Sequence, residues 1–69
     1  MKRIDARGLA CPQPMMLIRK AVQENPEGAE ILVDDVCAVE NIGRFAANME
    51  YSMEKQSEGE ATLLTLVKK

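Results

Sequence analysis

A cysteine followed at once by proline, with a second proline two residues later, constrains this chain more than any other feature. The segment is Cys11-Pro12-Gln13-Pro14, and an apolar pattern with helical spacing runs from there to about Glu24. Proline is tolerated in the first turn of a helix, because its missing N–H would have no partner there. Proline also keeps the residue before it out of the helical region. The sequence therefore predicts a helix that begins at Pro12, with Cys11 as its N-cap.

The rest of the chain alternates between strand and helix patterns. Gly8 interrupts the first strand pattern and allows a tight turn before the cysteine. A turn over 57–60, with Gly59 in the left-handed conformation, joins the last two strands. The predicted elements are a strand over 2–6, a helix over 12–24, a strand over 29–35, a helix with an apolar stripe from Ala38 to Met49, and strands over 51–56 and 61–67.

This β-α-β-α-β-β order predicts an α+β fold of two layers. Both helices would cover one face of a four-stranded mixed sheet. Right-handed crossovers make the first three strands parallel, and the final hairpin reverses the last one. The other face would be uncovered, with Leu63, Thr65 and Val67 on one side of the last strand and Leu64 and Leu66 on the other. We therefore expect part of an apolar row to be exposed as a partner surface.

Length and composition narrow the classes of protein further. The 69 residues are enough for a single small domain over 1–69, which can also be one domain of a longer protein. Neither a membrane span nor the apolar centre of a signal peptide is recognisable. A net charge of −2 and only two aromatic residues argue against nucleic acid as a direct partner. Two cysteines without a secretion signal predict a cytoplasmic protein, in which cysteines are free, catalytic or metal-bound.

Cys11 is the main candidate for a reactive residue. The partial positive charge at a helix start favours the thiolate by about 0.3–1 kcal/mol, which lowers its pKa by less than about one unit. Arg7 is near enough in sequence to add to this effect. Because Pro12 and Pro14 have no N–H, only the N–H groups of Cys11 and Gln13 would hold the sulfur. The alternative is an inert cysteine that packs as a small hydrophobic residue.

The sequence contains no histidine, so the usual base of a cysteine protease or acyltransferase is missing. Asp5, Asp34 and Asp35 are expected near the same end of the sheet, but a solvated carboxylate is a poor base for a thiol. Thiol exchange, persulfide relay and metal capture remain, because each needs only a thiolate. Two cysteines cannot fill a structural zinc site alone, and we expect neither a bound metal nor a cofactor.

The motif D-x-x-G-L-x-C-P-x-P, together with the element order, resembles the TusA-like or SirA-like sulfur-carrier family. The residues that carry this resemblance are Asp5, Gly8, Leu9, Cys11, Pro12 and Pro14. The segments "DARGLACPQP" and "VENIGRFA" are most similar to the N-terminal domain of YedF-like proteins, which are linked to selenium metabolism. The resemblance implies a sulfurtransferase-like carrier that holds persulfide sulfur on Cys11. A cysteine desulfurase or another donor would supply the sulfur, and an acceptor protein would take it.

The residues around Cys11 would then set the specificity for these partners. We expect this role for Arg7, Leu9 and Gln13, and for Met16 where it is exposed, since exposed methionine suits an adaptable binding surface. Each of these has a simpler interpretation, as solvated surface or, for Met16, as part of the core.

Cys37 is expected at or near the start of the second helix, on the same rim as Cys11. There it can resolve a persulfide on Cys11, or pair with Cys11 under oxidation; alternatively it fills an alanine-sized space. Two other functions stay open. One is a non-catalytic regulatory or protein-binding module that docks through the open sheet face, and the other is a redox switch that uses both thiols.

Overall fold

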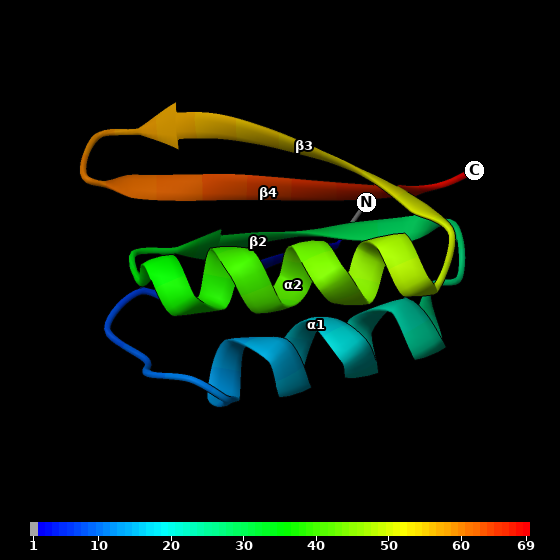
Figure 1. Cartoon of the computed structure of the whole chain (residues 1–69), viewed down its shortest axis with the longest axis horizontal. Coiled ribbons are helices and arrows are strands. Elements are labelled where there is room, and N and C mark those ends of the chain that lie inside the picture. Colours follow the sequence, from blue (N-terminus) through cyan, green and yellow to red (C-terminus); the bar gives the residue numbers. More distant parts are fainter. Residues whose placement is uncertain (1) are drawn as a thin grey trace.

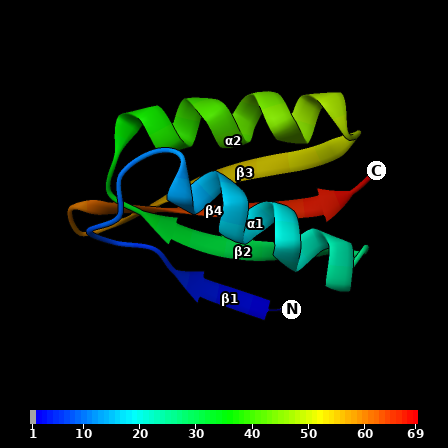
Figure 2. The ribbon, with the colours of Figure 1, turned by 90° about the horizontal axis from the view of Figure 1, so that it is seen from below.

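Two helices lie side by side on one face of a four-stranded sheet (Figures 1 and 2). The computed structural model describes residues 2–69. In chain order the elements are β1 (Lys2–Asp5), α1 (Gln13–Glu24), β2 (Gly28–Val33), α2 (Val36–Asn48), β3 (Tyr51–Glu58) and β4 (Ala61–Lys68). The predicted β-α-β-α-β-β order and the α+β class are confirmed. No helix within these residues is both long enough and apolar enough to cross a membrane.

The strands lie in the order β1-β2-β4-β3. β1 pairs with β2 in parallel, and β4 pairs antiparallel with both β2 and β3. Because β4 runs against both of its neighbours, β1, β2 and β3 all point the same way, as predicted from right-handed crossovers. The pairing of β4 with both β2 and β3 places it in the middle of the sheet, and β1 and β3 form the edges of the sheet.

The hydrophobic core lies between the helices and the sheet. Its largest fully buried side chains are Ile18, Ile31, Ile42, Leu64, Leu66, Val33 and Pro14. Burying an aliphatic side chain of the size of Ile18 contributes about 1.5–3 kcal/mol. Pro14 is part of this core and lies in the first turn of α1. The second proline of the motif therefore anchors the start of the helix by packing.

The uncovered face of the sheet differs from the expected apolar row. Leu63 is only 4% exposed, whereas Val67 is 42% exposed. In the register of the sheet, Leu63 is flanked by Leu32 of β2 and Gln56 of β3, and the side chain of Leu32 is itself half-buried. Side chains of the neighbouring strands thus shield this position, and the prediction of an exposed apolar row is wrong except at Val67.

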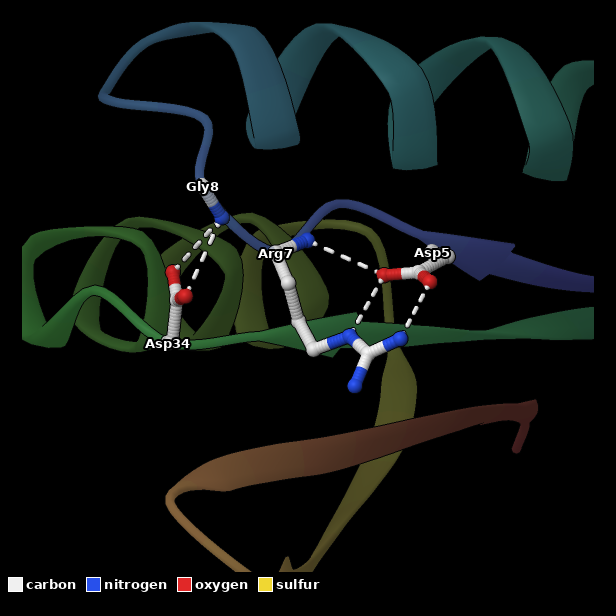
Figure 3. Close-up of polar contacts among 4 residues, drawn as sticks. All are labelled: Asp5, Arg7, Gly8 and Asp34. Carbon is white, nitrogen blue, oxygen red and sulfur yellow. Dashed lines mark hydrogen bonds and ion pairs between the residues drawn. The ribbon is translucent and has the colours of Figure 1, made fainter.

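Two carboxylates hold the segment between β1 and α1 (Figure 3). Asp5 accepts hydrogen bonds from the backbone N–H and the Nε of Arg7 at 3.1 and 3.0 Å, and from its Nη2 at 2.8 Å. Asp34, which follows β2, accepts from the N–H of Gly8 with both oxygens, at 3.1 and 3.0 Å. Gly8 has φ 82°, a left-handed conformation that glycine adopts without a steric penalty. These contacts set the direction of the chain just before Cys11.

Gly28 provides the sharpest test of the sheet geometry. Its φ is 137°, and a Cβ at this position would overlap the carbonyl oxygen of Leu66 in β4. We expect Gly28→Ala to destabilise the fold by about 2–6 kcal/mol, the sum of backbone strain and overpacking. Gly59→Ala is the matched control, because Gly59 also has a positive φ but has open space around it. Thermal unfolding should show a much larger fall in Tm for Gly28→Ala, and equal falls would contradict this geometry.

The contact between Arg7 and Asp5 predicts a pH dependence. Hydrogen bonds from Arg7 lower the pKa of Asp5 from about 3.8 to about 2. A carboxyl with a lowered pKa stabilises the fold above its unfolded pKa, and that contribution disappears as the pH falls towards 2. Arg7→Gln should return the pKa of Asp5 to its usual range and reduce the loss of stability between about pH 4 and 2.

NMR titration of the Asp5 carboxyl carbon measures this shift directly. Arg3→Gln serves as the control, since Arg3 pairs with Glu30 rather than with Asp5. An Asp5 pKa that is the same in the wild type and in Arg7→Gln would show that Arg7 does not hold this carboxylate in solution.

Candidate functional site: two thiols at the start of the helices

Both helices begin at the same end of the sheet (Figures 1 and 2), and each of the two cysteines lies close to one of these helix starts. Both are free thiols; Cys11 is half-buried and packs against the core, and Cys37 is exposed. Cys11 belongs to the segment that leads from β1 into α1, and Cys37 is the second residue of α2. The helices start at this end of the sheet because each follows the carboxyl end of a parallel strand. The structure therefore brings Cys11 and Cys37 to one rim, as predicted.

A single side chain joins the two sulfurs. The Nδ2 of Asn41 donates to the Sγ of Cys11 at 3.3 Å and to the Sγ of Cys37 at 3.5 Å. Asn41 lies one helical turn after Cys37, so it faces the same side of α2. Sequence reasoning missed this residue. The spacing of four residues from a cysteine was the available signal, but its contact with Cys11 spans 30 residues and arises only in the fold.

Arg44 determines which way the amide of Asn41 points. Its Nη2 donates to the Oδ1 of Asn41 at 2.6 Å. A guanidinium group can only donate hydrogen bonds, so the atom that faces it must be the amide oxygen. The NH₂ group of Asn41 is consequently directed at the two sulfurs.

The start of α1 differs from the prediction by one residue. Pro12 rather than Cys11 is the N-cap, and the helix begins at Gln13. The reason is a turn closed by the N–H of Gln13, which donates to the carbonyl of Ala10 at 3.0 Å and leaves Cys11 and Pro12 in the middle of the turn. The prediction that the N–H of Gln13 holds the sulfur is therefore wrong.

The pKa of Cys11 also shifts in the opposite direction to the prediction. It is raised, first by the neighbouring Cys37 thiol and then by burial, with a smaller contribution from Asp35; only the hydrogen bond from Asn41 lowers it. Arg7, expected to favour the thiolate, has its guanidinium bound to Asp5 instead. The raised pKa makes Cys11 less readily ionised than an ordinary thiol.

The three aspartates near this end of the sheet are each hydrogen-bonded to another part of the chain. Asp5 binds Arg7, and Asp34 binds the N–H of Gly8. Asp35 is the N-cap of α2 and accepts from the N–H of Cys37 at 3.0 Å. Their carboxylates thus shape the rim that carries the thiols. Among the described residues 2–69, no group of three or more cysteine, aspartate or glutamate side chains is arranged to hold a metal ion.

Two hollows are lined by residues that neighbour the thiols, although neither is lined by a cysteine. The smaller one, of about 370 Å³, is lined by Leu9, Gln13, Met16, Leu17 and Lys20. Met16 is 62% exposed there, so it belongs to the surface rather than to the core. The larger one is a groove of about 740 Å³ between α1 and α2, which includes Asn41 and Arg44 and continues past Arg19. Leu9, Gln13 and Met16, for which the sequence predicts a role in partner specificity, thus line one hollow, and that role stays a prediction; the groove was missed.

Comparisons with known proteins agree with this fold. The family described as "Sulfurtransferase TusA" matches residues 2–69. A relative from Methanocaldococcus jannaschii, named "Putative sulfur carrier protein", is 39% identical over 71 residues, which cover all of this chain and 95% of the relative. The crystal structure of a SirA-like protein from Desulfitobacterium hafniense matches with a TM-score of 0.88 and 31% identity, over 97% of this chain and 96% of that one. This chain belongs to the TusA sulfurtransferase family.

Proposed function

We propose that this protein carries sulfur as a persulfide on Cys11, between a donor protein and an acceptor protein. The observation that carries the proposal is a half-buried thiol on an open rim, beside a hydrogen-bond donor and a second thiol. Membership of the TusA family and the name of the archaeal relative support sulfur carriage in general. The lack of histidine fits this chemistry, since sulfur exchange between thiols needs no general base held by the carrier.

The proposed reaction has two exchanges of the same kind. In the first, the Cys11 thiolate attacks the outer sulfur of a persulfide on the donor, such as a cysteine desulfurase. The donor S–S bond breaks, its electron pair stays on the donor thiolate, and Cys11 becomes Cys11–S–SH. In the second exchange an acceptor thiolate attacks the outer sulfur and Cys11 leaves as a thiolate. A persulfide is more acidic than a thiol, so the loaded form ionises more readily than the resting thiol, and both exchanges proceed through the protonated persulfide Cys11–S–SH.

Intact mass spectrometry tests the proposal. After incubation with a cysteine desulfurase and cysteine, we expect the protein to gain the mass of one sulfur atom, located on Cys11 by peptide mapping. Cys11→Ser should gain nothing, and Cys37→Ala should load as well as the wild type. An unchanged mass in the wild type, while another acceptor in the same tube is loaded, would refute the proposal.

The hollow beside Cys11 is the proposed docking surface for these partners, because any donor must bring its own sulfur to this thiol. We expect Met16→Glu to slow loading from the desulfurase by about tenfold, equivalent to a loss of about 1.4 kcal/mol of binding. Loading from inorganic polysulfide should be unaffected, since it needs no docking. Met49→Glu is the control, because Met49 is also exposed but lies at the other end of α2. Equal slowing with polysulfide, or in Met49→Glu, would exclude this surface.

The similarity to YedF-like domains extends the proposal to selenium. Cys11 would then carry selenium in place of sulfur, and the mass experiment distinguishes the two elements when the donor is given selenocysteine. We place the relay in the cytoplasm, where reducing conditions keep thiols in the free form that both cysteines have here.

A second candidate function is a thiol redox switch. It is favoured by the two sulfurs lying within hydrogen-bonding distance of one nitrogen. Cys37 also has a proposed role in sulfur carriage: attack of its thiolate on the inner sulfur of a Cys11 persulfide would form a disulfide and release hydrosulfide. The mass spectrum separates these cases, because a disulfide loses two hydrogens and a persulfide gains sulfur. The third alternative, docking through the open sheet face, is weakened by the shielding of Leu63.

A further inference from the structure

We propose that Asn41 is a positioning residue for sulfur transfer, whose amide, oriented by Arg44, donates one N–H to the sulfur of Cys11 and the other to the sulfur of Cys37. The two thiols then form one site for a sulfur anion. The role in transfer rests on the proposed function above, whereas the hydrogen bonds themselves are testable without any sulfur donor.

The geometry uses every polar atom of the amide. A primary amide has two diverging N–H bonds and one carbonyl oxygen. The nitrogen is 3.3 and 3.5 Å from the two sulfurs, and the oxygen is 2.6 Å from the guanidinium of Arg44. Rotating the amide by half a turn would place its NH₂ group against Arg44, donor against donor, and its oxygen against the sulfurs. Arg44 therefore selects the orientation in which Asn41 can stabilise a negative sulfur.

This orientation of the Asn41 amide matters when sulfur is released from Cys11. When an acceptor thiolate takes the outer sulfur from Cys11–S–SH, the S–S bond breaks and its electron pair stays on the Sγ of Cys11. The transferred sulfur keeps its proton, so no oxidant or reductant is consumed. A thiolate leaves faster when it is better stabilised. Asn41 donates directly to the atom on which this charge develops.

The surroundings of Cys11 oppose its thiolate form, whereas Asn41 favours it. The titratable groups that act on Cys11 are Cys37 and Asp35, both at the start of α2, and both oppose the thiolate, as does burial. On the segment that contains Cys11, the guanidinium of Arg7 donates hydrogen bonds to the carboxylate of Asp5. The hydrogen bond from Asn41 is the contribution that favours the thiolate.

The first test measures the alkylation rate of Cys11 by iodoacetamide against pH, with the site read by peptide mapping. We expect Asn41→Leu to raise the apparent pKa of Cys11 by about one unit. Asn41→Asp, which keeps the shape and the contact with Arg44, should raise it more, because a carboxylate cannot donate and adds a negative charge. Arg44→Met should give a smaller rise by freeing the amide to rotate, and Arg44→Lys should restore the wild-type value, since an ammonium also only donates.

Asn48→Leu is the control, because it removes an asparagine from the end of the same helix, away from the thiols. Thermal unfolding of each variant separates a change at the site from a loss of fold. If Asn41→Leu and Asn41→Asp are folded and the pKa of Cys11 stays unchanged in both, the positioning role is refuted.

The second test follows the release of sulfur from preloaded Cys11, in a single turnover, to a small thiol. Asn41→Leu should slow release by about threefold for each unit of pKa rise. A wild type that does not load sulfur, combined with the expected pKa shifts, would refute the proposed function and leave the positioning of the thiols intact. A wild type that loads and releases sulfur at the same rate as Asn41→Leu would refute only the role of Asn41.

Discussion

The site depends on the hydrogen bonds between the backbone of Gly8 and the carboxylate of Asp34. They tie the segment after β1 to the end of β2, two places that are 26 residues apart in sequence. α2 begins two residues after Asp34, so the same contact places the approach to α1 beside the start of α2. It acts together with the buried Pro14 and the hydrogen bonds of Asn41 to hold Cys11 close to Cys37. A carboxylate that accepts a backbone N–H with both oxygens is well suited to this, because it holds the loop by a charge-assisted bond.

The two prolines have separate consequences that together define the environment of Cys11. Pro14 is buried in the core and fixes the first turn of α1 against the sheet, whereas Pro12 occupies the N-cap. Cys11 consequently lies in a turn before the helix rather than at its cap. The dipole of a helix is worth about 0.3–1 kcal/mol at its first turn and falls off rapidly beyond it. The neighbouring thiol of Cys37 and the burial of Cys11 itself outweigh so small an effect, and this explains why the pKa of Cys11 rises.

The sequence alone was sufficient for the order of elements, the common direction of the first three strands and the meeting of both cysteines at one rim. These follow from local patterns and from the handedness of crossovers. The sequence was insufficient for every feature that depends on contacts between residues far apart in the chain. Asn41 and Arg44 look like ordinary solvated positions on a polar helix face, and only the fold brings Asn41 to Cys11. The burial of Leu63 likewise depends on β4 being a central strand, which the hairpin pattern leaves undecided.

The opposing influences on Cys11 suit its proposed role, in which the thiol both accepts and releases sulfur. Loading needs a good nucleophile, and nucleophilicity rises with the pKa of the thiol, but so does the fraction that is protonated and inactive. Release needs a good leaving group, which a high pKa opposes. Cys37 and burial raise the pKa of Cys11, whereas the hydrogen bond from the amide of Asn41 lowers it and so favours release. Because Asn41 donates to both sulfurs, an anion on either cysteine is stabilised by the same group. Balance between the two half-reactions is then a property of the whole cluster of Cys11, Cys37, Asn41 and Arg44, rather than of the motif cysteine alone.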